Sequence, residues 1–379
     1  MTQKLKLGMV GGGRGAFIGG IHRIASRIDG AWDLVAGALS SDPERAAASA
    51  VDLGIDPMRS YASYSDMATA EAARADGIDA VAIVTPNHMH AGPAIAFLEA
   101  GIHVICDKPL SATMEDALKI EQAVKRTGKL FILTHNYTGY PLMRQAREMI
   151  AQGDLGDLRM VHVEYVQDWL TEAADADNKQ ADWRTDPARS GAGGCVGDIG
   201  THAFNLASYV TGLETEKLAA DLTAFVPERR VDDNVEVMLR FKGGAKGMLW
   251  ASQIAVGNEN GLRLRVFGTK GGLEWDQENP NQMTFTRFGA PKQIYTRGGA
   301  SAAGTGLRNL RTPGGHPEGY LEAFATIYAE AAQIIQATKD GTDVPEGVHT
   351  PDISDGILGM KFIAACIDSS QNDTTWVAL

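Results

Sequence analysis

Cysteine is scarce in this sequence: among 379 residues there are three, Cys106, Cys195 and Cys366. They are far apart in the chain and odd in number, so they fit neither a disulfide framework nor the paired spacing of a cysteine-ligated metal site. Scarce, unpaired cysteine is typical of proteins kept in a reducing compartment. We therefore expect no bound metal and a cytoplasmic location.

Long apolar runs and an excess of basic residues are also missing. No stretch approaches the roughly 18 uncharged apolar residues of a membrane span, and the opening segment MTQKLKLGMVGGG lacks the apolar core of a secretory signal. With 35 Lys and Arg against 47 Asp and Glu, the net charge is -12, which argues against binding to a phosphate backbone. We therefore expect neither a membrane nor a nucleic-acid partner.

The length and the 44% hydrophobic content allow a large core and predict two domains. In residues 1–137, strands alternate with helices, and Asp42 and Pro43 are typical of a helix start. This alternation predicts an α/β fold with a doubly wound, mostly parallel sheet, that is, a Rossmann domain. The expected strands are 5–10, 32–39, 78–85, 102–107 and 129–134, and the expected helices are 16–28, 42–54, 88–101 and 113–128.

The pattern changes in residues 138–379. After a helix at 140–153, strands follow with little helix between them, which predicts a large open, mostly antiparallel sheet with one exposed face. Residues 290–317 are rich in Gly and Ser and read as a long surface excursion, and helices at 317–341 and 352–370 close the chain. The expected strands are 159–167, 218–226, 234–241, 244–254, 262–269 and 271–276.

A glycine-rich stretch, GMVGGGRGAFIGG at residues 8–20, lies between the first strand and the first helix. Gly11, Gly13 and Ala16 fit the dinucleotide fingerprint G-x-G-x-x-[G/A], in which the last position packs the helix on the strand. A phosphate-binding P-loop is excluded because no Gly-Lys-Ser/Thr follows; a purely structural turn remains the alternative. The surplus glycine indicates an enlarged turn, whose other residues are also candidate cofactor contacts: Arg14, Phe17 and Ile18.

The end of the second strand bears on the choice of cofactor. Dehydrogenases that use NAD usually place an acidic residue there to bind the ribose hydroxyls, whereas this chain has Ser40 followed by Ser41. Arg45 lies near enough in sequence to reach a 2′-phosphate, and Asp42 is the expected helix cap. We expect NAD, with NADP as the alternative.

Polar residues follow the later strands at the carboxyl edge of the sheet, where ligands of open α/β sheets bind. Thr85, Pro86 and Asn87 follow the third strand, although Asn87 also suits the role of a helix cap, and His90 lies just beyond. Asp107 and Lys108 follow the fourth strand, and Asn136 follows the fifth. A lysine at such a point is most often a surface charge, but close to a nicotinamide it can hold a substrate oxygen or take part in proton transfer.

Asp198 and His202 are the most informative pair in the second half. They are four residues apart at the start of a predicted helix and therefore share one face. Oxidation of an alcohol by hydride removal also requires loss of the hydroxyl proton, and histidine, which titrates near neutral pH, is a natural acceptor. The alternative is an ordinary surface pair on the helix; the glycine-rich approach at 191–194 favours a site.

Together these motifs resemble the glucose–fructose oxidoreductase / inositol dehydrogenase family, often called Gfo/Idh/MocA. The resemblance rests on GMVGGGRGA, TPNHMH, GIHVICDKPL, WRTDPARSGAGGCVGDIGTH and GHPEGYLEAFATIY. It implies a Rossmann domain followed by a substrate-binding and oligomerisation domain, and it identifies Lys108, Asp198 and His202 as the catalytic residues. It also implies nicotinamide-dependent oxidation of a small polyhydroxylated substrate: a sugar, a sugar derivative or a cyclitol.

Three positions depart from the family pattern. Asp107 stands where glutamate is usual, and Asn205 stands where many members have aspartate. In many members a histidine follows the third glycine by three residues; here His22 has that relation to Gly19, as if three residues were inserted in the fingerprint.

Further candidates for the substrate pocket are Tyr137, Asp168, Arg184 and His316, and Trp183 and Arg184 are candidates beside the cofactor. For the aromatic residues, simple core packing is the alternative. Two other functions remain open: a redox-neutral, NAD-dependent enzyme that cleaves a glycoside through transient oxidation, and a dinucleotide-binding sensor without turnover. An open sheet face also favours a homo-oligomer, a dimer or a tetramer.

Overall fold

The computed structural model describes residues 4–173 and 179–379. The chain forms two compact units, which we describe separately. Unit 1 consists of Met1–Asn136 and Leu321–Ile357, and unit 2 consists of Tyr137–Tyr320 and Leu358–Leu379. Residues 321–357 therefore belong to the first unit, whereas the sequence pattern indicated that they belong to the second domain.

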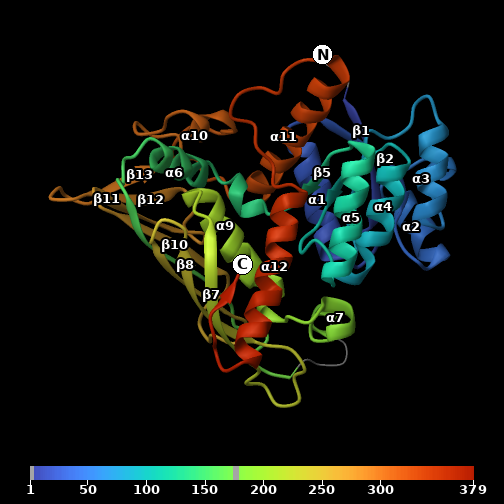
Figure 1. Ribbon diagram of the computed structural model, residues 1–379. Helices are drawn as coiled ribbons and strands as arrows, with labels where there is room; N and C mark the ends of the chain where they lie inside the picture. The colour runs from blue at the N-terminus through green and yellow to red at the C-terminus, as the bar shows by residue number, and fades with distance from the viewer. Residues whose placement is uncertain (1–3, 174–178) are drawn as a thin grey trace. The chain divides into compact units, whose positions relative to one another are not determined.

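Unit 1 is built on a parallel sheet with the strand order β2-β1-β3-β4-β5. Figure 1 shows its strands β1, β2 and β5. The strand order reverses between β1 and β3, and this switch point is where open α/β sheets bind ligands. Every residue of β3 and β4 is buried, as expected where helices cover both faces of a sheet. The strands are β1 (Leu5–Gly11), β2 (Trp32–Ala38), β3 (Ala80–Val84), β4 (His103–Cys106) and β5 (Phe131–Leu133).

The helices of unit 1 largely follow the predicted alternation. Asp42 caps α2 through a bond from the Arg45 amide, with Pro43 at the first position, which confirms the predicted helix start. Helix α3 was not predicted, because its apolar residues do not gather on one side. The helices are α1 (Phe17–Ile28), α2 (Pro43–Asp52), α3 (Tyr64–Ala73), α4 (Ala91–Glu99), α5 (Met114–Thr127) and most of α11 (Tyr320–Asp340), with the short turns η1 (Pro57–Arg59), η2 (Asn87–Met89) and η3 (Asn136–Gly139), the last of which continues into unit 2.

Helix α11 joins unit 1 through α1 and β2. The ring of His22 in α1 lies 2.7 Å from the Tyr328 hydroxyl, and the Trp32 indole donates to the Tyr328 carbonyl at 2.9 Å. All three side chains are buried. These contacts explain why a helix far along the chain folds with the first unit.

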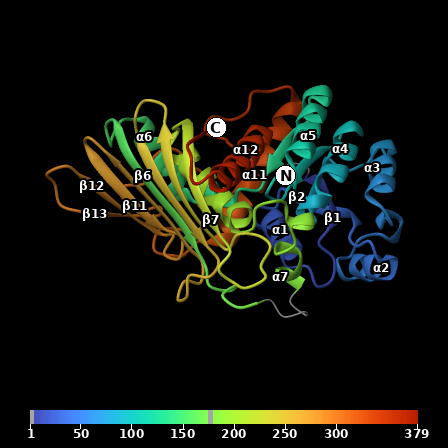
Figure 2. The same cartoon turned by 60° about the horizontal axis from the view of Figure 1, so that its bottom comes forward.

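Unit 2 contains a large sheet with the order β13-β12-β11-β10-β6-β9-β8-β7-β14. Its neighbouring strands are antiparallel except for the β6–β9 pair, and Figure 2 shows them side by side. Burial alternates along β8, as expected when one face is packed and the other is exposed. The strands are β6 (Leu158–Val166), β7 (Thr215–Thr223), β8 (Asn234–Phe241), β9 (Lys246–Ser252), β10 (Gly261–Gly268), β11 (Gly271–Asp276), β12 (Gln282–Arg287), β13 (Gln293–Thr296) and β14 (Val377–Ala378).

Helices cover the packed face of this sheet. Helix α9 packs on β6, β9 and β10. It also packs against α6, which lies near it in Figure 1, and Phe204 of α9 stacks on Phe362 of α12. The helical segments are α6 (Pro141–Ala151), α7 (Lys179–Arg184), α8 (Pro187–Ser190), the π-helical turn η4 (Val196–Gly200), α9 (Thr201–Thr211), α10 (Thr305–Arg308) and the end of α12 (Ile353–Gln371).

Residues 290–317, which were expected to form a long surface loop, contain regular secondary structure. They contain β13 and α10, and Arg297 within them is buried. Its guanidinium donates to Glu318 Oε1 at 3.0 Å and to the Thr312 and Pro313 carbonyls at 3.0 and 3.2 Å. A buried ion pair therefore anchors this Gly-rich segment.

Candidate active site

The glycine loop after β1 has the geometry of a dinucleotide turn. Gly11 and Gly12 have φ of 79° and 72°, a conformation that favours glycine. A Cβ on Gly13 would lie 2.7 Å from both the Leu39 carbonyl oxygen and Ser49 Oγ. The backbone is thus pressed close to its neighbours, and no side chain fits at these points.

The close approach of helix to loop falls at Gly19 rather than at Ala16. A Cβ on Gly19 would lie 2.4 Å from the Gly12 Cα, whereas Ala16 is the residue that precedes α1. The packing role that we expected for Ala16 therefore belongs to Gly19. The turn between Gly13 and Gly19 is correspondingly enlarged and exposes the Phe17 ring.

A pocket of about 380 Å³ lies beside this loop. Helix α1 begins there with no side-chain cap and no acidic residue in its first turn, so its backbone N–H groups suit a phosphate. Arg23 Nη1 donates to the Gly12 carbonyl at 2.6 Å, and Arg14 forms an ion pair with Asp52. The lining residues are Gly12, Gly13, Arg14, Gly15, Ala16, Phe17, Arg23, Ser49, Asp52 and Leu53. This chemistry fits the pyrophosphate of a dinucleotide.

After the end of β2, the Asp42 carboxylate serves as the cap of α2. Asp42 Oδ1 accepts a 2.8 Å bond from the Arg45 amide, and the Asp42 amide donates to Ser40 Oγ at 3.1 Å. Ser41 and the Arg45 side chain are exposed.

The loops after β3 and β4 are joined by a buried histidine. His90 Nε2 lies 2.8 Å from the Thr85 carbonyl oxygen, and His90 Nδ1 lies 2.9 Å from that of Pro109. Both ring nitrogens thus face protein carbonyls, so the ring is not placed to contact a cofactor as we had expected. Asn87 begins η2 and does not cap α4, whose preceding residue is His90.

The loops after β4 and β5 are joined by Asp107. Its Oδ1 accepts from the Lys108 amide at 2.9 Å and from the Thr134 hydroxyl at 3.0 Å. Asn136 is buried, and its Nδ2 has no hydrogen-bond partner among the described residues. A buried amide donor at this edge fits the carbonyl group of a nicotinamide carboxamide. Burial lowers the pKa of neighbouring His135 to about 3.

A second, polar cluster lies in unit 2. Asp198 is in η4 and His202 is in the first turn of α9, so a π-helical turn, a feature frequent at functional sites, connects them. Asp198 Oδ2 accepts from Arg184 Nε at 3.2 Å and from Gln253 Nε2 at 2.9 Å. The His202 ring is 7% exposed and stands edge-on to the Tyr137 ring at 4.8 Å.

Tyrosine hydroxyls continue this cluster. The hydroxyls of Tyr137 and Tyr165 are 2.5 Å apart, and that of Tyr165 donates to Asn260 Oδ1 at 2.8 Å. Burial raises the pKa of both tyrosines, so they remain neutral hydrogen-bonding groups.

The glycine-rich approach to His202 is held by Asp232. Its two carboxylate oxygens accept from the Gly194 and Val196 amides at 2.7 Å each, and burial raises its pKa to about 6. A Cβ on Gly194 would lie 2.3 Å from the Asp232 carbonyl oxygen. Four residues of this cluster were not predicted from the sequence, because no local pattern links them to the motif: Asp232, Gln253, Tyr165 and Asn260.

The remaining candidates make contacts of their own. The Arg184 guanidinium lies over the Trp183 ring at 4.3 Å. Asp168 Oδ2 accepts from the Gly257 amide at 2.9 Å, which is a turn-stabilising contact. His316 is exposed, and its ring lies 3.3 Å from the Pro313 carbonyl oxygen of its own loop.

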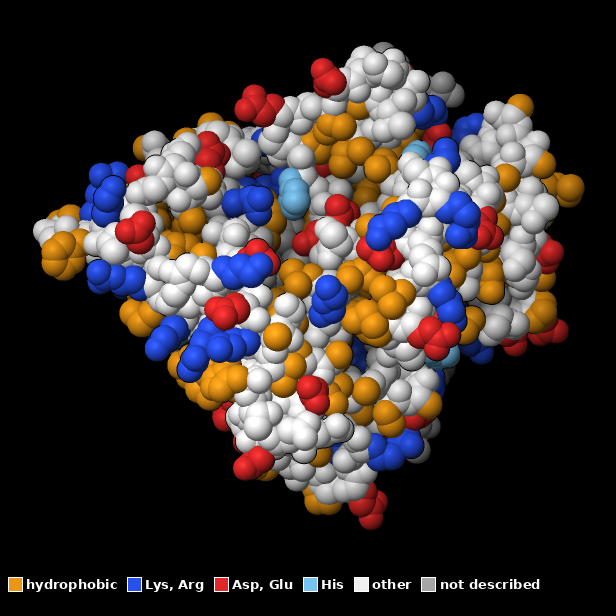
Figure 3. Space-filling model, viewed as in Figure 1, with side chains coloured by type: hydrophobic (Ala, Val, Ile, Leu, Met, Phe, Trp, Pro, Cys, Tyr) orange, Lys and Arg blue, Asp and Glu red, His pale blue; other side chains and the backbone are white. Residues whose placement is uncertain are grey.

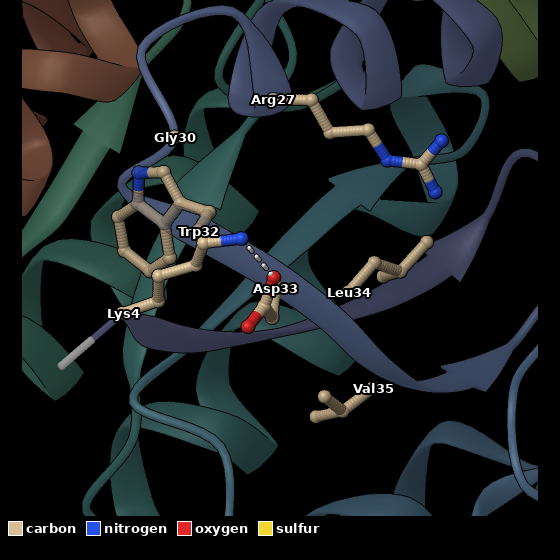
Figure 4. A pocket seen from close by; sticks show the side chains of 7 residues that line it. All are labelled: Lys4, Arg27, Gly30, Trp32, Asp33, Leu34 and Val35. Atoms are coloured by element: carbon tan, nitrogen blue, oxygen red, sulfur yellow. Dashed lines mark hydrogen bonds and ion pairs between the residues drawn. The ribbon is translucent and has the colours of Figure 1, made fainter.

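A further cavity of about 550 Å³ lies at the opposite end of the unit 1 sheet (Figure 4). Lys4 and Trp32 precede or begin β1 and β2, so this cavity is at the amino end of the strands, away from the edge where ligands of such sheets bind. Its ion pair, Lys4 with Asp33 at 2.9 Å, is exposed.

Within residues 4–173 and 179–379, no group of three or more His, Cys, Asp or Glu side chains is placed to hold a metal ion. In the same residues no helix is long and apolar enough to cross a membrane. Acidic and basic side chains are interspersed over the face shown in Figure 3.

Comparisons with known proteins agree with this geometry. Residues 5–135 match the model of the oxidoreductase family with an NAD-binding Rossmann fold, and residues 143–274 match the GFO/IDH/MocA C-terminal domain. An oxidoreductase from Sinorhizobium meliloti is 53% identical, with a TM-score of 0.91 over 99% of this chain and 100% of that chain.

Two relatives have more informative names. An inositol dehydrogenase homologue from Azotobacter vinelandii, solved in complex with NAD+, is 36% identical, with a TM-score of 0.96 over 100% of this chain and 98% of that chain. The levoglucosan dehydrogenase of Pseudarthrobacter phenanthrenivorans is 30% identical over 99% of this chain and 98% of its own length. The chain therefore belongs to the Gfo/Idh/MocA family of oxidoreductases and carries that family's NAD-binding Rossmann domain.

Proposed function

We propose that this protein is a dehydrogenase that uses NAD, or NADP, to oxidise a secondary hydroxyl group of a sugar, sugar derivative or cyclitol. The observation that carries the proposal is the pair of Asp198 in η4 and His202 in the first turn of α9. A buried imidazole and a carboxylate held by Arg184 and Gln253 form a site that can take a proton and bind a second hydroxyl. The inositol and levoglucosan dehydrogenase relatives support a polyhydroxylated ring as substrate.

In this proposal His202 is the general base. The nicotinamide, when bound, supplies the hydride acceptor. His202 takes the proton of the reacting hydroxyl, because neutral imidazole accepts a proton near neutral pH. The edge-on Tyr137 ring holds the imidazole plane, and the burial of His202 keeps bulk water away from it.

Asp198 and Lys108 orient the substrate. Arg184 and Gln253 fix the Asp198 carboxylate, which accepts a hydrogen bond from a hydroxyl neighbouring the reacting one. The Lys108 ammonium binds the reacting oxygen and stabilises the negative charge that develops as the proton leaves. Tyr137, Arg184, Asp168 and His316 are further proposed substrate contacts.

On the cofactor side, the pyrophosphate binds at the Gly11–Gly13 turn and the start of α1. Further proposed contacts with the dinucleotide are Arg14, Ala16, Phe17, Ile18, Ser40, Ser41, Arg45, Thr85, Pro86, Asn87, Asp107, Asn136, Trp183 and Arg184.

The function is tested by initial-rate reduction of NAD and of NADP across inositols, aldoses, glycosides and anhydrosugars. We expect turnover with one group of substrates, and a loss of about 10²- to 10⁴-fold in kcat for His202→Ala, the usual contribution of a general base. Binding of NADH, followed by its fluorescence, stays within about twofold of wild type. The control is His349→Ala, which changes a histidine in the segment between α11 and α12.

Unchanged turnover in His202→Ala contradicts the assigned role. Release of an aglycone without net NADH contradicts the net oxidation.

For the cofactor, we propose NAD with tolerance of NADP. Ser40 lacks the negative charge that repels a 2′-phosphate, and the exposed Arg45 side chain is at the first turn of α2. We expect Ser40→Asp to weaken binding of NADPH about 10-fold or more and to leave NADH bound, as measured by titration of each nucleotide. Equal effects on both nucleotides contradict this assignment.

We also propose that the exposed face of the unit 2 sheet mediates self-association into a dimer or tetramer. Met160, Met238, Met248 and Trp250 are 36–58% exposed on neighbouring strands β6, β8 and β9. The last three of these line a cavity of about 490 Å³. An apolar patch with charged neighbours is typical of an interface.

A further inference from the structure

His90 is a fully buried histidine whose ring bridges two turns at the carboxyl edge of the unit 1 sheet. One nitrogen is 2.8 Å from the carbonyl oxygen of Thr85, which directly follows β3. The other is 2.9 Å from that of Pro109, which directly follows Lys108. The bridge therefore spans the turns that carry Asn87 and Lys108.

Carbonyl oxygens only accept hydrogen bonds, so in each contact any hydrogen bond is donated by the ring. A neutral imidazole donates one such bond and a protonated one donates two. Burial lowers the pKa of His90, whereas the Asp107 carboxylate and the carbonyl groups favour the proton. A neutral ring bonds one of the two carbonyl groups and a protonated ring bonds both, and in either state the ring lies between the two turns.

The contacts of His90 are continued by those of Asp107, so that three loops are connected. On the other side of Lys108, Asp107 accepts from the Lys108 amide and from the Thr134 hydroxyl after β5. The loops after β3, β4 and β5 are thus tied in sequence, first by His90 and then by Asp107. Lys108 lies between the two ties.

We propose that His90 is a positioning residue for the reaction: its ring ties the Thr85 carbonyl to the Pro109 carbonyl and thereby sets the backbone from which Lys108 reaches its substrate. This role rests on the proposed function, in which Lys108 binds the reacting oxygen. It replaces the direct cofactor contact that the sequence indicated for His90. Without the bridge, the turn at Lys108 loses this side-chain link to the turn after β3 and keeps the link through the Asp107 carboxylate.

The variant His90→Phe keeps a ring in the cavity and removes both donors. Hydrogen exchange read by mass spectrometry reports the two turns directly, since amides exchange faster when a segment opens more easily. We expect exchange in residues 85–90 and 107–110 to rise at least about 10-fold. We expect kcat to fall about 10- to 100-fold with KM nearly unchanged, because a displacement of about 1 Å can cost on the order of 10²-fold.

The matched control is His103→Phe. His103 is buried at the opposite end of β4, and its Nδ1 accepts from the Leu130 amide at 3.0 Å. This variant removes a comparable hydrogen bond from the strand that leads to Lys108. We expect it to lower the free energy of unfolding while hydrogen exchange in residues 107–110 and kcat stay as in wild type. If His90→Phe does not fold, His90→Gln, which keeps one donor group, gives an intermediate effect in both measurements.

Two results overturn the proposal: unchanged exchange in both turns, or faster exchange with kcat as in wild type. If the wild-type protein oxidises nothing in the substrate panel, the proposed function fails. Hydrogen exchange and the NADH dissociation constant of His90→Phe then still decide the role of His90. Faster exchange in the two turns together with weaker NADH binding supports this role. Wild-type exchange and wild-type NADH binding contradict it.

Discussion

The side-chain amide of Gln253 donates a 2.9 Å hydrogen bond to Asp198 Oδ2. The same oxygen accepts from Arg184 Nε at 3.2 Å, so two segments that are distant in sequence hold one carboxylate. Gln253 directly follows β9 and is buried, which makes it a rigid support.

Replacing Gln253 by alanine removes this support. We expect kcat/KM for the sugar or cyclitol to fall about 10- to 100-fold, because a hydrogen bond to a charged group contributes roughly 1.5–3 kcal/mol. Steady-state kinetics measures the effect. The control is Gln336→Ala, an exposed amide on α11 that bonds Asp340. An equal loss in both variants contradicts a specific role for Gln253.

Gly19 and Gly20 are adjacent in α1 but differ in the space that is available for a side chain. A Cβ on Gly19 would lie 2.4 Å from the Gly12 Cα, whereas a Cβ on Gly20 meets nothing closer than Arg23 Nη2 at 3.9 Å. We expect Gly19→Ala to cost at least about 1–3 kcal/mol of folding free energy, because backbone must shift, and to weaken NADH binding. We expect Gly20→Ala to stabilise the helix by up to about 1 kcal/mol.

Urea unfolding and NADH titration of the two glycine variants test this contrast. Gly19→Ala with wild-type stability and NADH affinity would show that the loop and helix are not in the close contact described.

The buried His22 makes stability depend on pH. Burial lowers its pKa to about 4, against an ordinary 6.5. The unfolded chain therefore binds a proton that the folded chain does not, and stability is lost as pH falls from about 6.5 to about 4. For this group the loss between pH 7 and pH 5 is about 2 kcal/mol.

His22→Phe removes this titration and keeps a ring beside Phe324. We expect the difference in unfolding free energy between pH 7 and pH 5 to shrink by about 2 kcal/mol, measured by urea unfolding at each pH. His88→Phe, a change at an exposed histidine, leaves the difference as in wild type. An unchanged difference in His22→Phe contradicts the lowered pKa.

Self-association through the open sheet face is tested by Met248→Glu. Met248 is 58% exposed on β9, and a charge there opposes burial in an interface. Light scattering coupled to size-exclusion chromatography is expected to show a smaller species than wild type. Met58→Glu, at a methionine that is 79% exposed in η1, leaves the oligomeric state unchanged. A wild-type monomer, or no change in Met248→Glu, contradicts the assigned face.

The sequence by itself determined the local features. Apolar runs between helical segments predicted the parallel sheet of unit 1, because strands buried on both faces are apolar throughout. Successive strand patterns with little helix between them predicted the largely antiparallel sheet of unit 2. The cap at Asp42 was predicted from the Asp-Pro pair at the start of its helix, because a cap depends on neighbouring residues alone. Helix α3 escaped prediction because its apolar residues form no single stripe.

Only the tertiary structure decided which residues meet. Gly19, and not Ala16, is the residue at which α1 packs on the glycine loop. The His90 ring lies between the carbonyl groups of Thr85 and Pro109. Gln253 bonds Asp198, which is 55 residues away in sequence. Helix α11 folded with unit 1 through Tyr328, although it lies far along the chain. Periodicity records whether a side chain is buried, whereas its partner depends on strand order and helix packing, which bring distant segments together.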